Sequence, residues 1–477
     1  MKAKRLILLT ISVIAFLGIN LKASAQDTSP LSPDSLGKTI PVVILKGDFG
    51  YDYANGTVTV FGPQLPKTTY EAKIKWRGGT TNAADKHKRN YKIKLSTDQQ
   101  LFGMRKDNTW ILDAGQQDIF RLRNRVATEL WNDFARKPYY ASSEPSARTG
   151  VRGQVVEVFL NDEYRGVYCL TEAMDRKELK LKKTKGATIH GQLWKSTGYG
   201  ASMMYRDPPA YDNTSETWDV FETKYPELED VNPTEYADLW KVIHFVATSN
   251  NQDFRDSVAY YFDMPVVEDY YIFTQTLCAP DNTAKNMYMA IYDRTVSPML
   301  TFAVWDLNLT VGSIYLKNYS ASFVSPEYRL GGNNLIERLK ATDAGGFNHK
   351  VQTRYQEARK GILSTDSLIA RFARYRSLLK QSGADDRERE KWSGDSDICG
   401  EEIDFDNEMS YIEDWITRRM KYLDSNVFNI STGIDDLSTI ETLPDDAYYT
   451  LQGLKVGHDQ LRKGIYIQNH KKILIRN

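Results

Sequence analysis

Segments that alternate between hydrophobic and polar residues follow one another from Ile40 to Glu172, and this pattern constrains the fold more than any other feature. The clearest case is Val155–Glu172, where two alternating stretches flank Asn161-Asp162. A dipeptide of this kind between two strands is typical of a tight hairpin turn. Because successive strands are joined by short turns, the first part of the chain is predicted to form antiparallel sheet.

A second hairpin is predicted from Tyr70–Thr80 and Asn90–Leu95, which are joined by the polar loop TNAADKHKR. Asn90–Leu95 alternates throughout, so Lys92 and Lys94 lie on the face opposite the hydrophobic residues. The loop also carries Lys88, and a glycine pair precedes it. A glycine-containing loop with cations can bind phosphate groups, but an exposed charged hairpin tip would show the same pattern.

Hydrophobic residues recur at helical spacing in the later part of the chain. Helices are predicted over residues 118–134, 232–248, 265–280, 349–360, 366–381 and 403–423. Asp118 and Asn232 are the expected caps of the first two, and irregular structure is expected over 187–230 and 313–346. A strand-rich half followed by a helical half predicts an α+β fold rather than alternating βαβ units.

The two ends of the chain differ in composition from its centre. Residues 1–25 combine a basic start, an apolar run and Ala23-Ser24-Ala25, the pattern of a cleavable signal peptide. Four units are therefore expected: signal peptide 1–25, linker 26–38, main domain 39–429 and a small all-β tail 430–477. No later segment approaches the ~20 apolar residues of a membrane helix. We expect a protein without a membrane span, exported to the cell envelope or beyond.

Charge and motif content exclude several functional classes. The chain has 62 Lys and Arg against 62 Asp and Glu, and a zero net charge argues against general nucleic-acid binding. The six histidines and three cysteines form no spacing typical of a zinc enzyme. Cys169 and Cys278 lie in apolar segments and are expected to be buried thiols. Nucleotide-binding glycine motifs and the nucleophile elbow of hydrolases are also missing from the sequence.

The candidate site lies in the segment from Asp281 to Gly312. Two strand-like runs, MYMAIY and MLTFAVW, are separated by a Thr-Val-Ser-Pro turn, so a hairpin is predicted. Asp281, Asn286 and Asp306 lie near the ends of these runs. Phosphoryl transfer needs an acid that orients the attacking hydroxyl group and oxygen ligands that hold Mg²⁺. Asp and Asn are also common at strand ends and turns, so the same spacing has a purely structural explanation as well.

Several segments resemble, in order, the CotH kinase family of secreted or spore-coat atypical protein kinases. They include KWRGGTT…KRNYKIKL, WILDAGQQDIFRLRNRVATEL, VVEVFLNDEYRGVYCLTEAMDR and WDLNLTVG, within a resemblance that covers about Ile40 to Phe428. The resemblance implies a two-lobed, protein-kinase-like fold. It also implies transfer of the ATP γ-phosphoryl group to Ser or Thr of an exported or cell-surface protein, with Mg²⁺ or Mn²⁺.

The resemblance also implies roles for individual residues. Asp281 corresponds to the catalytic acid or base, and Asp306 to a metal-binding aspartate that takes part in catalysis. Asn286 and Asn308 are the further metal ligands. Lys88 occupies the position at which an ATP-phosphate contact is expected. The remaining candidates for nucleotide contacts are Arg77, Lys92, Lys94 and Glu172.

Two departures from the family pattern bear on activity. The Trp-Asp-x-Asp box ends in Asn308, which offers one neutral oxygen to a metal, and the glycine loop is Trp-Arg-Gly-Gly-Thr-Thr. A catalytically weak or inactive kinase-like surface protein that binds proteins or glycans is therefore the alternative. A carbohydrate-processing enzyme with the acids Glu157 and Glu172 is a third, although the sequence does not fix their separation. The pattern YYTLQG…KGIYI…KKILIR resembles tails of exported proteins from Bacteroidetes-type bacteria, some of which are sorting signals.

Overall fold

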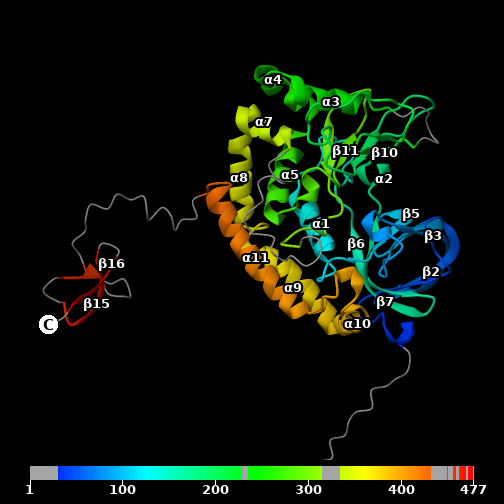
Figure 1. Cartoon of the computed structure of the whole chain (residues 1–477), viewed down its shortest axis with the longest axis horizontal. Helices are drawn as coiled ribbons and strands as arrows, with labels where there is room; N and C mark the ends of the chain where they lie inside the picture. Colours follow the sequence, from blue (N-terminus) through cyan, green and yellow to red (C-terminus); the bar gives the residue numbers. More distant parts are fainter. Residues whose placement is uncertain are drawn as a thin grey trace, which may run out of the picture.

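The computed structural model describes residues 31–227, 235–313 and 333–430, together with 448–449, 455–457, 461–468 and 471–475. The predicted signal peptide and the start of the linker lie outside these residues. The described chain forms a closed β-barrel, a second sheet of five strands and a set of helices (Figure 1). The strands of the barrel come first in the sequence and most helices come later, which confirms the predicted α+β class.

Seven strands form the barrel, in the order β1-β2-β3-β4-β5-β7-β6. Their bounds are β1 (Val42–Lys46), β2 (Ala54–Gly62), β3 (Leu65–Arg77), β4 (Asn90–Gln100), β5 (Lys106–Asp113), β6 (Gly153–Leu160) and β7 (Glu163–Glu172). Neighbouring strands are antiparallel except at the closure, where β1 pairs in parallel with β6. Both predicted hairpins are confirmed, since β3 pairs with β4 and β6 pairs with β7.

The second sheet has the order β12-β11-β8-β10-β9. Its strands are β8 (Gln192–Ser196), β9 (Thr217–Trp218), β10 (Phe221–Tyr225), β11 (Tyr288–Ile291) and β12 (Leu300–Ala303). The predicted hairpin of β11 and β12 is confirmed, and all the residues of both strands are buried. The irregular segment predicted over 187–230 is partly wrong, because β8 pairs with β11 and β10 pairs with β8. The sequence of a strand of only five residues carries little information about a partner strand that is distant along the chain.

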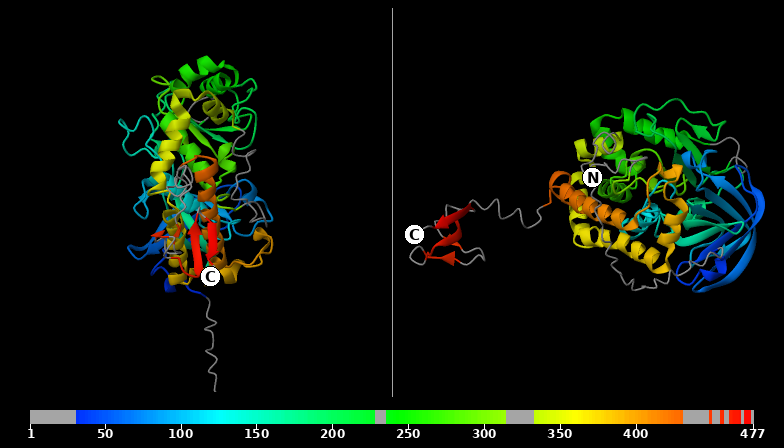
Figure 2. Two further views of the ribbon diagram at one scale, coloured as in Figure 1. Left: turned by 90° about the vertical axis from the view of Figure 1, so that its left-hand side faces the viewer. Right: turned by 60° about the horizontal axis from the view of Figure 1, so that its bottom comes forward.

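The helices are mostly gathered on one side of the molecule, with the barrel on the other (Figure 2). They are α1 (Arg123–Phe134), α2 (Arg176–Leu179), α3 (Ala237–Thr248), α4 (Asn251–Tyr261), α5 (Met264–Leu277), α7 (Asn334–Thr342), α8 (Phe347–Arg359), α9 (Thr365–Ser382), α10 (Ala384–Trp392) and α11 (Phe405–Asn426). Helix α5 is buried from Val266 to Leu277 and contacts α1, α8, α11 and β12. It is therefore the central helix, and its C-terminal end leads the chain to Asp281.

Several predicted helix limits are corrected by the structure. Helix α1 begins at Arg123 rather than at Asp118, whose carboxylate accepts a hydrogen bond from the Arg123 backbone at 2.8 Å from the turn ahead of the helix. Helix α3 begins at Ala237, and its expected cap Asn232 lies outside the described residues. The loop predicted over 313–346 contains α7, which Asn333 caps, and α4 and α10 were not predicted.

Four short strands form a separate antiparallel sheet near the C-terminal end of the sequence. They are β13 (Tyr448–Tyr449), β14 (Lys455–Val456), β15 (Gly464–Gln468) and β16 (Lys471–Ile475), in the order β14-β13-β15-β16. These strands fall inside the predicted tail, whose boundary at residue 430 stays a prediction. None of the helices in the described part of the chain has the length and hydrophobicity to cross a membrane. Cys169 and Cys278 are buried thiols, as expected.

Candidate active site

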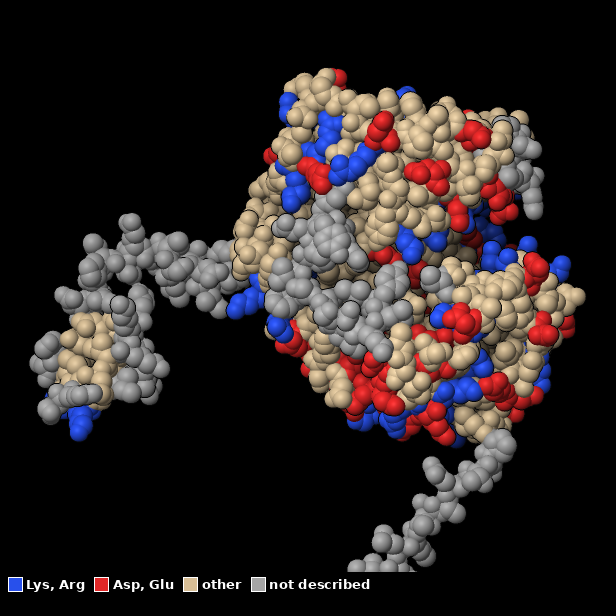
Figure 3. Space-filling model, in the orientation of Figure 1, with Lys and Arg blue, Asp and Glu red and all other residues tan. Residues whose placement is uncertain are grey.

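A polar cleft of about 440 Å³ is lined by residues of the barrel, of helix α1 and of the five-stranded sheet. This volume is within the range of small-molecule sites in proteins. The walls include the turn after β3, the end of β5, strand β8 and the two ends of the β11-β12 hairpin. Figure 3 shows a hollow in the surface with both acidic and basic side chains at its edges. The cleft therefore offers charged groups of both signs to a ligand.

The hairpin brings the three predicted polar residues into this cleft. Asp281, in a short helical turn after α5, lines it together with Asn286 and Asp306. Because Tyr288 lies opposite Ala303, the residues just before β11 and just after β12 meet at the same end of the hairpin. The Asn286 side-chain amide donates a hydrogen bond to Asp306 Oδ2 at 3.4 Å. The structure thus joins residues that the sequence spacing predicted to be neighbours.

Asn286 and Asp306 both have left-handed backbone conformations, with φ of 61° and 57°. Asn and Asp adopt this region more readily than other residues with a side chain, although it still costs about 1–2 kcal/mol. The loop after Asp306 is held by Asn124 of α1, whose Oδ1 accepts a hydrogen bond from the Leu307 backbone at 3.0 Å. The same Asn124 side chain donates to Asp113 Oδ2 at 2.6 Å. Helix α1 therefore fixes two acidic groups of the cleft at once.

Asp281 is nearly buried, and its carboxylate has defined neighbours. The Tyr199 hydroxyl group donates a hydrogen bond to Asp281 Oδ1 at 2.5 Å. Lys285 Nζ lies 3.7 Å from Asp281 Oδ2. A carboxylate oriented in this way by a hydroxyl group and a cation can position the hydroxyl group of an acceptor and take its proton.

The electrostatics of the cleft centre on Asp306. Asp306 is exposed to solvent within the cleft, where neighbouring protein atoms replace part of the water around its carboxyl group. This partial burial raises the pKa of the Asp306 carboxyl group, and the negative charges of Asp113 and Asp281 raise it further, against the opposing charges of Lys195 and Arg77. Carboxylates that repel one another in this way are a suitable environment for a divalent cation.

Cations line the cleft beside these acids. Arg77, at the end of β3, lies over the Trp305 ring with 5.3 Å between its guanidinium carbon and the ring centroid. Lys195, on β8, lies opposite Tyr288 in the sheet. Burial lowers the pKa of Lys195, while the Asp306 charge opposes this effect. Sequence reasoning missed Lys195 because β8 lies in the segment expected to be irregular, where a run as short as QLWKS is only a weak sign of a strand.

The other predicted contact residues divide into two groups. Arg77 and Asn308 line the cleft, whereas Lys88, Lys92, Lys94 and Glu172 are not among its lining residues. Lys92 is partly buried close to Arg77, and burial together with the Arg77 charge lowers its pKa. Lys94 is exposed on the outer face of the barrel.

The partners of Lys88 in the structure do not agree with the phosphate contact expected for it. Its Nζ donates to Glu388 Oε1 at 2.6 Å and to the Val167 carbonyl group at 2.8 Å, and only 1% of the residue is exposed. The expected nucleotide contact of Glu172 is also corrected, because its buried carboxylate binds Arg152 at 2.7 Å and the Arg105 backbone N–H at 2.7 Å. Both residues therefore serve the fold.

The same contacts contradict a glycosidase based on Glu157 and Glu172. Glu157 is 1% exposed, and it accepts hydrogen bonds from Arg387 at 2.8 Å and from the Tyr164 hydroxyl group at 2.8 Å. Neither acid lines the cleft. A pair of acids that flanks a sugar bond must be reached by the substrate and by water, and these two are closed off from both.

Comparison with family models matches residues 74–423 to the family described as CotH kinase protein. The match includes the cleft residues of the β11-β12 hairpin, the turn after β3, and helices α1 to α5 and α7 to α10. No curated protein matches the chain.

Proposed function

The chain belongs to the CotH kinase family, and on that premise we propose that it transfers the γ-phosphoryl group of ATP to Ser or Thr of an exported protein. The observation that carries this proposal is the meeting of Asp281, Asn286 and Asp306 in one charged cleft. In this proposal the barrel and the helical region are the two lobes of a kinase-like fold. Export follows from the signal-peptide pattern of residues 1–25 and from the tail at 430–477, a sorting segment in this proposal.

The donor atoms of the cleft fit Mg²⁺ or Mn²⁺. Asp306, Asn286 and Asn308 offer the hard oxygen ligands that these ions prefer. Partial burial raises the pKa of Asp306, and the negative charges of Asp113 and Asp281 raise it further. A cation would offset these charges. A bound divalent ion would supply charge neutralisation for the phosphate groups of the nucleotide.

The remaining roles belong to side chains of the chain itself. Asp281 orients the acceptor hydroxyl group and accepts its proton, helped by the hydrogen bond from Tyr199. Arg77 and Lys195 hold the phosphate oxygens, because both are cations that line the cleft. Lys195 also interacts electrostatically with Asp306, so this cation acts beside a proposed metal ligand. Arg77 can donate two parallel hydrogen bonds to a phosphate group, and its contact with Trp305 restricts its position.

Replacing Lys195 by methionine is expected to weaken binding of ATP with Mg²⁺ by about 10- to 150-fold, since a hydrogen bond to a charged group contributes about 1.5–3 kcal/mol. Isothermal titration calorimetry measures this change directly. Lys241→Met, on the exposed side of α3, is the matched control and should bind as the wild type does. Equal affinities of all three proteins would contradict the role of Lys195 while leaving the proposed activity open to the next test.

The proposed activity is tested by incubating the purified protein with ATP labelled in the γ-phosphoryl group. We expect label to appear on Ser or Thr of a protein acceptor, to be lost on chelation of divalent ions, and to return with Mg²⁺ or Mn²⁺. Nucleotide binding without transfer would favour the binding-scaffold alternative. The neutral amide of Asn308 in the cleft is the observation that supports this alternative. Failure to bind nucleotide at millimolar metal would overturn the proposal.

A further inference from the structure

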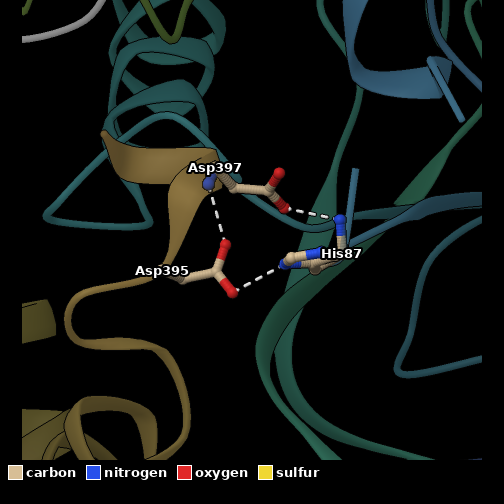
Figure 4. Close-up of side chains that lie close together, drawn as sticks. All are labelled: His87, Asp395 and Asp397. Carbon is tan, nitrogen blue, oxygen red and sulfur yellow. Dashed lines mark hydrogen bonds and ion pairs between the residues drawn. The ribbon is translucent and has the colours of Figure 1, made fainter. Parts of the chain in front are cut away.

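A second group of ion-binding side chains lies outside the cleft. His87 belongs to the loop between β3 and β4, and Asp395 and Asp397 belong to the turn between α10 and α11. One potential ligand atom from each of the three lies within 4.8 Å of the others. Figure 4 shows the imidazole ring and the Asp395 carboxylate facing each other, with Asp397 beside the His87 backbone. In the described parts of the chain, no other three His, Cys, Asp or Glu residues meet in this way.

Asp397 provides the strongest indication that an ion belongs there. It is 2% exposed, and its Oδ2 accepts hydrogen bonds from the backbone N–H groups of His87 and Lys88 at 2.9 and 2.8 Å. Its Oδ1 is buried and accepts no hydrogen bond from any described residue. A buried carboxylate oxygen without a hydrogen bond costs free energy, and its charged neighbour, the Lys86 ammonium group, lies 3.9 Å away. A metal ion would be a closer partner.

Asp395 and His87 complete the group from the solvent side. His87 Nδ1 lies 2.8 Å from Asp395 Oδ2, and the side chains are 55% and 19% exposed, so ions in solution can reach them. The other oxygen of Asp395 accepts a hydrogen bond from the Asp397 backbone at 2.8 Å, which holds the turn in shape. The backbone therefore positions both carboxylates before any ion binds.

We propose that His87, Asp395 and Asp397 bind a divalent transition-metal ion of the Zn²⁺ type. One imidazole nitrogen and two carboxylate oxygens are ligands that Zn²⁺ accepts, and water can complete four-coordination. The imidazole nitrogen disfavours Ca²⁺ and Mg²⁺, which prefer oxygen ligands. His87 and Asp395 are 308 positions apart, which explains why no metal spacing is visible in the sequence.

Lys86 is the competing cation at this site. Its Nζ lies 3.9 Å from Asp397 Oδ1 and 3.3 Å from Asp85 Oδ2, so it can keep Asp85 as its partner when an ion occupies the site. The bound ion would tie the β3–β4 loop to the turn after α10. Gly78, Gly79 and Thr81, at the start of that loop, line the cleft, so the ion would stabilise one wall of it. Binding of Zn²⁺ itself does not depend on the proposed phosphoryl transfer.

The test measures Zn²⁺ binding to the full chain by calorimetry, with Zn²⁺ alone as the probe and Asp306→Asn as the background, which removes an acidic ligand of the cleft. Further substitution His87→Ala or Asp395→Asn is expected to weaken Zn²⁺ binding by at least about tenfold, since even indirect partners of a metal ligand contribute 10- to 100-fold. His190→Ala is the matched control, because His190 Nδ1 pairs with Asp293 at 3.0 Å and belongs to no such three-residue group.

Zn²⁺ affinity that is lost with His87 or Asp395 and kept with His190 supports the site. Unchanged affinity in the His87→Ala and Asp395→Asn proteins, or failure of the background protein to bind Zn²⁺, overturns it. Circular dichroism and thermal melting without metal establish that the variants are folded. The melting temperature should rise with Zn²⁺ in the background and His190→Ala proteins, and stay constant in the other two.

Discussion

Replacing Asp306 by asparagine is expected to lower the rate of phosphoryl transfer by about 10³-fold or more. A metal ion contributes several kcal/mol of charge stabilisation in the transition state, and each 1.36 kcal/mol corresponds to a factor of ten in rate. The substitution keeps the size of the side chain and its capacity to accept the hydrogen bond from Asn286. It removes a negative charge that the charges of Asp113 and Asp281 repel, so the protein should fold normally. The rate is measured with γ-labelled ATP, and metal-dependent nucleotide affinity by calorimetry.

The matched control is Asp293→Asn, at the turn of the same hairpin. Asp293 binds His190 and Thr295 and does not line the cleft, so this variant should transfer phosphate at the wild-type rate. If Asp306→Asn keeps the wild-type rate, Asp306 is not a metal ligand in the reaction. If both variants lose activity together with their thermal stability, the loss reflects folding rather than the site.

Replacing Glu388 by alanine is expected to lower the free energy of unfolding by about 3–5 kcal/mol, the range measured when one partner of a buried ion pair is removed. Glu388 is fully buried. Its carboxylate accepts hydrogen bonds from Lys88 at 2.6 Å, from Arg121 at 2.7 Å and from the Val167 backbone at 2.6 Å. The variant would leave two buried cations without their shared anion. Urea unfolding, followed by tryptophan fluorescence and circular dichroism, measures the change.

Asp386→Ala on the same helix is the matched control for Glu388. Asp386 pairs with Arg389 at 2.6 Å, but both side chains are more than half exposed. Exposed pairs contribute about 0–1 kcal/mol, so this variant should unfold close to the wild-type urea concentration. A Glu388 variant as stable as this control would show that the barrel and α10 are held together by apolar packing instead of by the ion cluster.

Local patterns predicted the parts of the fold whose partners are close in sequence. The β3-β4, β6-β7 and β11-β12 hairpins were found because alternation and turn residues lie within one short segment. The same locality explains why Asp281, Asn286 and Asp306 were predicted to meet, as one hairpin carries two of them and adjoins the third. Their chemical roles stay predictions.

The parts that sequence reasoning missed depend on distant pairing. Lys195 lines the cleft because β8 pairs with β11, which no local pattern in residues 187–230 indicated. Lys88 was assigned to phosphate because a loop cation near glycines fits a nucleotide site. Its carboxylate partner, Glu388, lies 300 positions away, and only the folded chain identifies it. A cation that lies next to a site in the sequence can thus form an ion pair with a carboxylate of the scaffold instead of contacting the ligand.

The parallel closure of the barrel has a consequence for the order of folding. Strand β1 finds its last partner only when β6 is available, with Val42 opposite Glu157. Contacts of such high contact order slow the folding of a chain, because loop-closure entropy must be lost before the contacts form. A newly made polypeptide would therefore stay unfolded longer. The barrel cannot close until β6 has been synthesised, because β1 pairs with β6 at the closure.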